Sequence, residues 1–216
     1  STKNATVTMR KQSILILSLL LTGKVMLAQD VVKVQSGAVI TVQSGAELVV
    51  KGGISLANGS ILNNAGAIRM SQNGASGTAD WVDNTVTGYN YGTGKVIFNG
   101  NGGHLINSKN TFGQIDIDAS GHATLGSDIQ ANKWYLKNGK LNTTSSYKAI
   151  ALSADQLAVE ADPSNTNFSN SWVNGNLRRY VLPASVSTYI FPVGDAVKAN
   201  RAVLDNLSGS PLNNLT

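Results

Sequence analysis

The chain has 216 residues, 22 of them glycine, and only 13% are charged. This composition suits many short strands and turns and argues against long amphipathic helices. It contains no cysteine, which excludes disulfides and thiolate chemistry. The formal net charge is +5 (17 basic, 12 acidic), but four of the basic residues precede Asp30, so the remainder carries about +1 and offers no electrostatic footprint for nucleic acid.

The first thirty residues carry the pattern of an export signal. Residues 1–8 lack an initiator methionine and are interpreted as sequence from upstream of the true start, Met9. A basic pair, an apolar run and a small-residue cleavage site then follow in order: Arg10-Lys11, residues 14–21, and Met26-Leu27-Ala28 before Gln29. Residues 9–28 are therefore predicted to be a signal peptide, cleaved between Ala28 and Gln29, and the mature protein is predicted to be secreted or exposed on the outer cell surface. The alternative is a buried core helix.

Residues 29–70 repeat one short pattern. The pentapeptide Val-Gln-Ser-Gly-Ala occurs at 34–38 and again at 42–46. Glycines recur every six to eight residues: Gly37, Gly45, Gly53, Gly59 and Gly66. Three short faces per coil of about 22 residues would place Gly37 over Gly59 and Gly45 over Gly66. We therefore predict an all-β fold, a parallel β-helix or β-solenoid of glycine-punctuated strands, with an antiparallel sandwich as the alternative.

Apolar residues of these short strands are candidates for an inward, apolar column: Val39, Leu48, Ile54, Leu56, Ile61, Leu62 and Ile68. Asn58, Asn63 and Asn64 are expected in the turns, where Asn tolerates a left-handed backbone. Their amides are also expected to stack from one coil to the next.

Residues 71–94 interrupt the rhythm and are predicted to be a loop excursion from the coil. This stretch is polar and rich in glycine, and it contains Trp81, Tyr89 and Tyr91 beside Asp80 and Asp83. Exposed aromatic rings beside acids stack on sugars, so these three aromatic residues are candidate glycan-binding residues. The alternative, which we favour, is that they pack the loop onto the coil.

Short strands resume over 95–182, which is predicted to continue the solenoid. The expected strands lie at 95–98, 104–106, 113–118, 123–125, 129–131, 134–136, 149–152 and 172–180. Asn-Gly turns at 99–100 and 138–139 also permit antiparallel hairpins. The adjacent arginines Arg178 and Arg179 are expected to form a solvated pair.

Five motifs then occur in a recognisable order: FGQIDI (112–117), ATLGSDIQA (123–131), WYLKNGKLNT (134–143), WVNGNLRR (172–179) and YIFPVGD (189–195). In this order they resemble large, secreted, adhesin-like cell-surface proteins of Bacteroidota, many of them substrates of the type IX secretion system. The resemblance implies that residues 183–216 begin a further β-sandwich-like module. It also implies that a C-terminal domain beyond this sequence engages the type IX export machinery, and that the chain is an N-terminal fragment.

Asp116 and Asp118 share one face of the predicted strand 113–118 because two isoleucines alternate with them. With Asp128 they are candidate acids of a carbohydrate-active enzyme, since glycoside hydrolysis needs two carboxylates at one bond and a lyase needs a base. Calcium also accepts such oxygens. The alternative, which we favour, is ordinary solubilising acids, and we therefore predict neither a catalytic site nor a resident cofactor.

The two histidines, His104 and His122, lie in turn-rich stretches without a second histidine at ligand spacing, so no metal site is predicted. The sequence thus predicts a non-enzymatic, structural or adhesive surface protein. Its coils would form a stiff spacer whose exposed ladders contact extracellular glycans or surface proteins. The alternatives are a polysaccharide lyase or glycoside hydrolase on a β-helix, and a passive stalk whose function lies in the missing C-terminal part.

Overall fold

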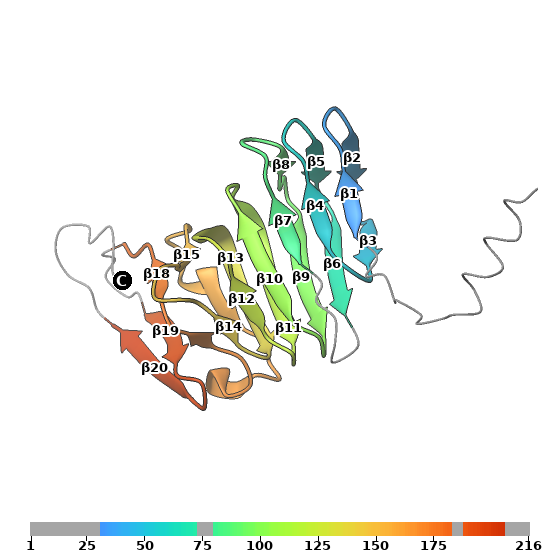
Figure 1. Ribbon diagram of the computed structural model, residues 1–216. Helices are drawn as coiled ribbons and strands as arrows, with labels where there is room; N and C mark the ends of the chain where they lie inside the picture. Colours follow the sequence, from blue (N-terminus) through green and yellow to red (C-terminus); the bar gives the residue numbers. More distant parts are fainter. Residues whose placement is uncertain (1–30, 73–79, 183–187, 206–216) are drawn as a thin grey trace, which may run out of the picture.

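A computed structural model describes residues 31–72, 80–182 and 188–205. The upstream segment, the predicted signal peptide and its cleavage site lie outside the described residues. Within them, short strands stack side by side along one column, a β-solenoid of about seven turns (Figure 1). The all-β, parallel β-solenoid prediction is confirmed.

The strands form three sheets, and, except for the antiparallel pair at the C-terminal end, neighbours within a sheet come from successive coils. The nine-stranded sheet contains, in order, β1 (Val32–Val34), β4 (Ile54–Leu56), β7 (Trp81–Asp83), β10 (His104–Ser108), β12 (Ala123–Leu125), β14 (Leu141–Asn142), β17 (Val173–Asn174), β19 (Tyr189–Gly194) and β20 (Ala199–Leu204).

The eight-stranded sheet contains β3 (Glu47–Val50), β6 (Ala67–Gln72), β9 (Lys95–Gly100), β11 (Phe112–Ala119), β13 (Ile129–Asn138), β15 (Ala149–Ala151) and β18 (Leu177–Arg179), with β16 (Val159–Ala161) also paired to β13. The three-stranded sheet consists of β2 (Val39–Val42), β5 (Ile61–Asn64) and β8 (Tyr89–Asn90). Two short 3-10 helices, η1 (Gln156–Ala158) and η2 (Thr166–Phe168), interrupt a later coil.

The corners of the first coils show why glycine recurs. Gly37 and Gly59 both have positive φ angles, 81° and 82°, which favour glycine, and the Gly37 amide donates to the Gly59 carbonyl at 2.9 Å. Gly37 therefore lies over Gly59, as predicted. The second predicted pair is off by one residue: because Glu47 pairs with Ala67, Gly66 lies over Ala46 rather than over Gly45. A Cβ on Gly66 would lie 2.3 Å from the Ala46 carbonyl oxygen, so the close contact itself requires glycine.

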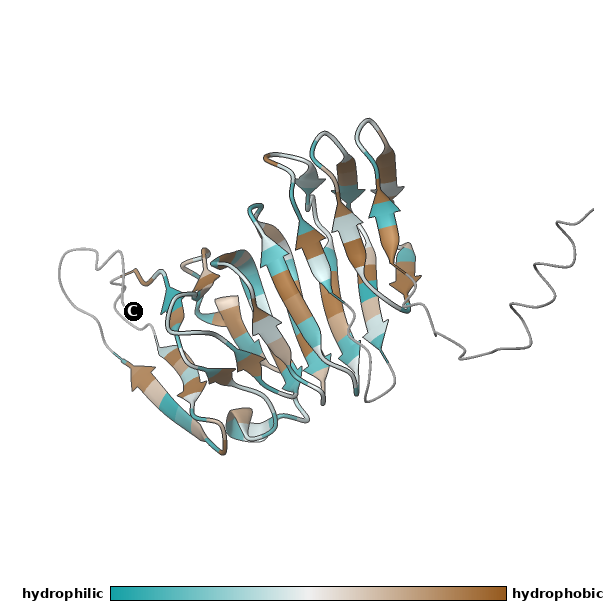
Figure 2. Cartoon of the chain, viewed as in Figure 1, coloured by the Kyte–Doolittle hydropathy of each residue, from teal (hydrophilic) through white to brown (hydrophobic). Residues whose placement is uncertain are grey.

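The core is a single apolar column to which alternate residues of each strand contribute, and apolar and polar bands alternate along the strands in Figure 2. Ile54, Leu56, Leu62 and Ile68 are buried in it as predicted, and Leu48 packs against it. Two other predictions were wrong: Val39 and Ile61 pair with each other and point outward, with 58% and 39% of their surface exposed. Val39 and Ile61 are each the first residue of a four-residue strand, in which the second and fourth residues face the core.

The described residues of the predicted loop excursion, 71–72 and 80–94, include strands that belong to the coil. The first two residues extend β6, and after residue 79 the chain forms β7 and β8. Trp81 in β7 pairs with Ile54 of the preceding coil and with Ile106 of the following one. The sequence did not predict β7 and β8 because each is only two or three residues long and the residues around them are polar. The antiparallel hairpins that the Asn-Gly turns permit do not form, since the strands on either side of these turns pair in parallel with other coils.

The column changes shape after its third coil. The three-stranded sheet ends at β8, and the next coil passes from β10 to β11 through the short turn 109–111 instead of a third strand. In Figure 1, β2, β5 and β8 accordingly stand beside only the first three coils. The rings of Trp81, Tyr89 and Phe112 pack at this step with centroids 4.9 to 5.2 Å apart, which fills the core where the cross-section changes.

At the C-terminal end, the described residues of the segment 183–216 form β19 and β20. Within the described residues they extend the solenoid's own nine-stranded sheet: β19 pairs with β17 in parallel, and β20 is antiparallel to β19. Of the arginine pair, Arg178 is partly exposed but Arg179 is fully buried. The predicted solvated pair is therefore wrong for Arg179, whose guanidinium donates to the carbonyls of Ile190, Asp155 and Gln156 at 2.7 to 3.0 Å.

Candidate functional site

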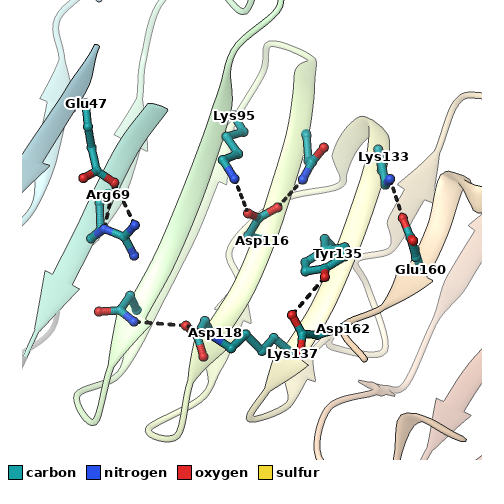
Figure 3. A network of polar contacts seen from close by, with 12 residues as sticks. Glu47, Arg69, Lys95, Asp116, Asp118, Lys133, Tyr135, Lys137, Glu160 and Asp162 are labelled. Atoms are coloured by element: carbon teal, nitrogen blue, oxygen red, sulfur yellow. Dashed lines mark hydrogen bonds and ion pairs between the residues drawn. The ribbon is translucent and has the colours of Figure 1, made fainter. Parts of the chain in front are cut away.

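The outer surface of the eight-stranded sheet carries most of the charged side chains that interact across coils. We call this surface the charged face, defined by Glu47, Arg69, Lys95, Asp116, Asp118, Lys133, Tyr135, Lys137, Glu160 and Asp162 (Figure 3). Parallel pairing aligns residues from different coils into rows, one of which runs from Arg69 through Ile97, Asp116 and Tyr135 to Glu160. The face thus follows from register and not from nearness in sequence.

Asp116 and Asp118 lie on this face, as predicted, because Ile115 and Ile117, which alternate with them along β11, point into the core with no exposed surface. The Asp116 carboxylate contacts Lys95 Nζ at 3.2 Å and accepts from the Gln114 side-chain amide at 2.6 Å.

Asp118 is held in the same way. Its carboxylate accepts from Lys137 Nζ at 3.0 Å and from the Asn99 amide at 3.2 Å. Each of the two acids is therefore neutralised by a lysine from a neighbouring coil.

Tyr135 and Asp162 complete a shallow groove beside these acids. The Tyr135 hydroxyl donates to Asp162 at 2.9 Å. Burial, this hydrogen bond and the surrounding carboxylates raise the pKa of Tyr135 to about 12. The pKa of Asp162 is lowered, chiefly because its carboxylate accepts from the Ser164 hydroxyl and amide and from Tyr135. At neutral pH the tyrosine is thus a hydrogen-bond donor and Asp162 an anion.

The chemistry of this groove can be compared with that of a glycosidase, which needs one carboxyl kept protonated by a raised pKa. The pKa of Asp162 moves in the opposite direction. Asp116 and Asp118 already form hydrogen-bonded ion pairs. The arrangement suits a network of ion pairs that stiffens the sheet or makes polar contacts with a ligand. Asp116, with only 7% of its surface exposed, is not the solubilising acid that the sequence favoured.

Asp128 does not join this cluster. It precedes the first residue of β13 and accepts from the Lys148 amide at 2.9 Å. The residue of β13 paired with Asp116 is Tyr135, which is seven positions after Asp128, or roughly 23 Å along an extended strand. Of the three candidate acids in the enzymatic alternative, Asp128 therefore lies apart from Asp116 and Asp118. Among the residues that the structure describes, no three His, Asp or Glu side chains gather to hold a metal ion.

The predicted aromatic binding residues separate into two kinds. Trp81 and Tyr89 have 0% and 3% of their surface exposed, so neither presents a ring to solvent, and the expectation of exposed rings is wrong for both. The competing expectation, that they pack a loop onto the coil, is right about their burial, but both rings enter the core from strands of the coil itself. Tyr91 is partly exposed and packs against the edge of the core. It alone keeps a surface on which a ligand can stack.

The histidines have structural partners. His104 contacts the Phe98 ring edge-on, with centroids 5.4 Å apart. His122 adopts a φ of 70°, and its Nδ1 accepts from the Lys140 amide at 3.1 Å. Partial burial and the nearby Lys140 charge lower the pKa of His122, which keeps the imidazole neutral as this hydrogen bond requires.

The stacked parallel coils, the closed apolar column and the three outer faces define an all-β protein of the β-solenoid class. Comparison with protein-family models, with curated proteins and with solved structures finds no match for the chain. In the described part of the chain, no helix has both the length and the apolar character needed to span a bilayer.

Proposed function

We propose that this chain is a rigid module of an exported cell-surface protein, which acts as a spacer and as an adhesive surface. The observation that carries the proposal is the continuous ladder of backbone hydrogen bonds from β1 to β19, which joins every coil to the next over a shared core. Such nearest-neighbour stacking resists bending and presents long, regular side faces. The leader-like residues 9–28 support export, and the motif order supports the type IX route.

A second candidate is a carbohydrate-active enzyme that uses the charged face. It is favoured by one observation: Asp116, Asp118 and Asp162 line the same groove, together with Tyr135. Their ion pairs and the lowered pKa of Asp162 argue against it, as described above.

One pair of assays separates these candidates. The purified chain is tested for binding on an array of neutral and acidic glycans, and for release of reducing ends from matching polysaccharides. The spacer–adhesive function predicts binding without turnover. Turnover that is lost in both Asp116→Asn and Asp118→Asn, in protein that remains folded by circular dichroism, would establish the enzyme instead.

The spacer function has its own test. Small-angle scattering is expected to give an elongated, rigid particle for the folded chain. Force spectroscopy of the chain between marker domains should show stepwise release of coils. A compact or freely bending particle would contradict the spacer, whatever the glycan assays find.

A further inference from the structure

The step where the third sheet ends leaves a groove that is separate from the charged face. Within the described residues β8 pairs only with β5, so its other edge borders the turn before β11. One hollow crosses β2, β5 and β8, a second lies along the open edge of β8, and the two share Asn90 and Gly92. We call the combined hollow the ledge groove, defined by Thr41, Asn63, Asn90, Tyr91, Asn110 and Thr111.

A ladder of amide and hydroxyl groups forms the floor of the ledge groove. The Asn90 side-chain amide donates to the side-chain oxygen Oδ1 of Asn63 at 2.9 Å, and Asn63 Nδ2 lies 3.5 Å from the Thr41 hydroxyl. Thr41, Asn63 and Asn90 lie on successive coils, so their polar groups recur about every 4.8 Å, the usual spacing between strands. The bonds between them hold the amides in place before any ligand arrives.

Tyr91 forms a platform at the margin of the groove. The backbone of Gly113 supports its ring closely: a Cβ on Gly113 would lie only 3.0 Å from Tyr91 Cδ2. Tyr91 packs against the core and is partly exposed to solvent. A rigidly supported, half-open phenol offers both an apolar surface and a hydroxyl group.

The lining of the ledge groove indicates the class of its ligand. None of the described residues that line its two hollows carries a charge, whereas the groove on the charged face is lined by Arg69, Lys95, Lys137 and three aspartates. Amides and hydroxyls both donate and accept hydrogen bonds, which matches the hydroxyl groups of sugars. The groove has no cation for an acidic glycan, and β8, at two residues, is too short to pair with an extended peptide.

We propose that the ledge groove binds a neutral oligosaccharide that lies along the column axis. Asn63 and Asn90 exchange hydrogen bonds with its hydroxyl groups, and one sugar ring stacks on Tyr91. This inference rests on the adhesive function proposed above, to which it adds a ligand class and a place.

The test uses isothermal titration of the purified chain with neutral cello-, manno- and xylo-oligosaccharides, and with oligogalacturonate as the acidic comparison. Asn90→Ala and Tyr91→Ala are each expected to weaken neutral-glycan binding at least tenfold. The matched control, Lys137→Ala on the charged face, should bind as the unmodified chain does. Asn90 is exposed, so Asn90→Ala keeps the test decisive if Tyr91→Ala fails to fold.

The inference is overturned if none of the neutral oligosaccharides binds, or if Asn90→Ala and a folded Tyr91→Ala both leave binding unchanged. Binding of oligogalacturonate alone, lost in Lys137→Ala, would overturn the ledge groove while leaving the adhesive function intact. Hydrolysis or elimination of any glycan would instead contradict the proposed function itself.

Discussion

The first three coils and the later coils share two sheets but differ in the third. Partners Val32 and Ile54 are 22 residues apart, and each early coil has room for a strand of the three-stranded sheet. Ile106 and Leu125 are only 19 residues apart, and a turn replaces that strand. The comparison teaches that two sheets suffice to continue the column. The three-stranded sheet is an addition, and the core must be covered by side chains where that sheet ends; we call these side chains the seal.

The seal has an apolar and a polar part. Trp81, Tyr89 and Phe112 fill the core at the step. Beside them the buried Asp83 carboxylate accepts from the Thr85 hydroxyl and amide, from Ser108 and from the Asn110 amide, at 2.6 to 2.9 Å. These contacts connect an early coil with the first later coil, so they are the place to uncouple the two regions.

The largest effect is expected for Trp81→Ala. Removing this fully buried ring should cost about 3–5 kcal/mol, and it should turn one unfolding transition into two because the regions lose their shared core. Trp81→Phe is the control: it keeps an aromatic ring and removes an indole N–H that has no partner among the described residues. Calorimetry and urea unfolding measure both. If Trp81→Ala unfolds in a single transition and loses less than about 1 kcal/mol of its free energy of unfolding, the two regions do not depend on a shared core at Trp81.

The next largest effect concerns the later coils alone. Burial lowers the pKa of Arg179 to about 10, so the guanidinium is still charged at pH 7 and anchors three carbonyls. Arg179→Ala should cost about 3 kcal/mol because buried acceptors lose their donors. The loss should fall on the transition of the later coils, whereas the partly exposed neighbour Arg178→Ala should cost less than about 1 kcal/mol. Equal losses for the two variants, measured by urea unfolding, would contradict this assignment.

Asp83→Asn tests the polar half of the seal. The new amide would bring hydrogens against groups that already donate, so about 1–3 kcal/mol should be lost. The exposed neighbour Asn84→Ala serves as the control and should change the midpoint of urea unfolding very little. If Asp83→Asn leaves the free energy of unfolding unchanged, the hydrogen-bond network around Asp83 does not stabilise the junction between the early and later coils.

The smallest effect is a pH dependence confined to the later coils, which contain both histidines, His104 and His122. The pKa of His122 is below 6.5 in the folded chain, so the unfolded chain takes up a proton first as the pH falls. Stability from this group is therefore present above pH 6.5 and decreases as the pH drops below that value. His122→Asn tolerates the positive φ and should reduce the stability difference between pH 7 and pH 5. An unchanged difference would contradict the assignment.

Much of the fold could be predicted because its signals are local. The Ser-Gly-Ala corners of the first coils require positive φ at Gly37 and Gly45, and short apolar stretches mark the strands between them. Strand alternation likewise predicted that Asp116 and Asp118 share an outer face.

The sequence alone therefore determined the class of fold and much of the apolar column, since both depend on turn residues and on a period of two. Only the tertiary structure decided what each face contains. Stacking brings Lys95 and Lys137 to Asp116 and Asp118 and takes Asp128 away from them. It also buries Trp81 and builds the ledge groove from Thr41, Asn63 and Asn90. The physical reason is that coil lengths vary from 18 to 32 residues, so the register between coils is set by shared backbone bonds and core contacts and not by spacing along the chain.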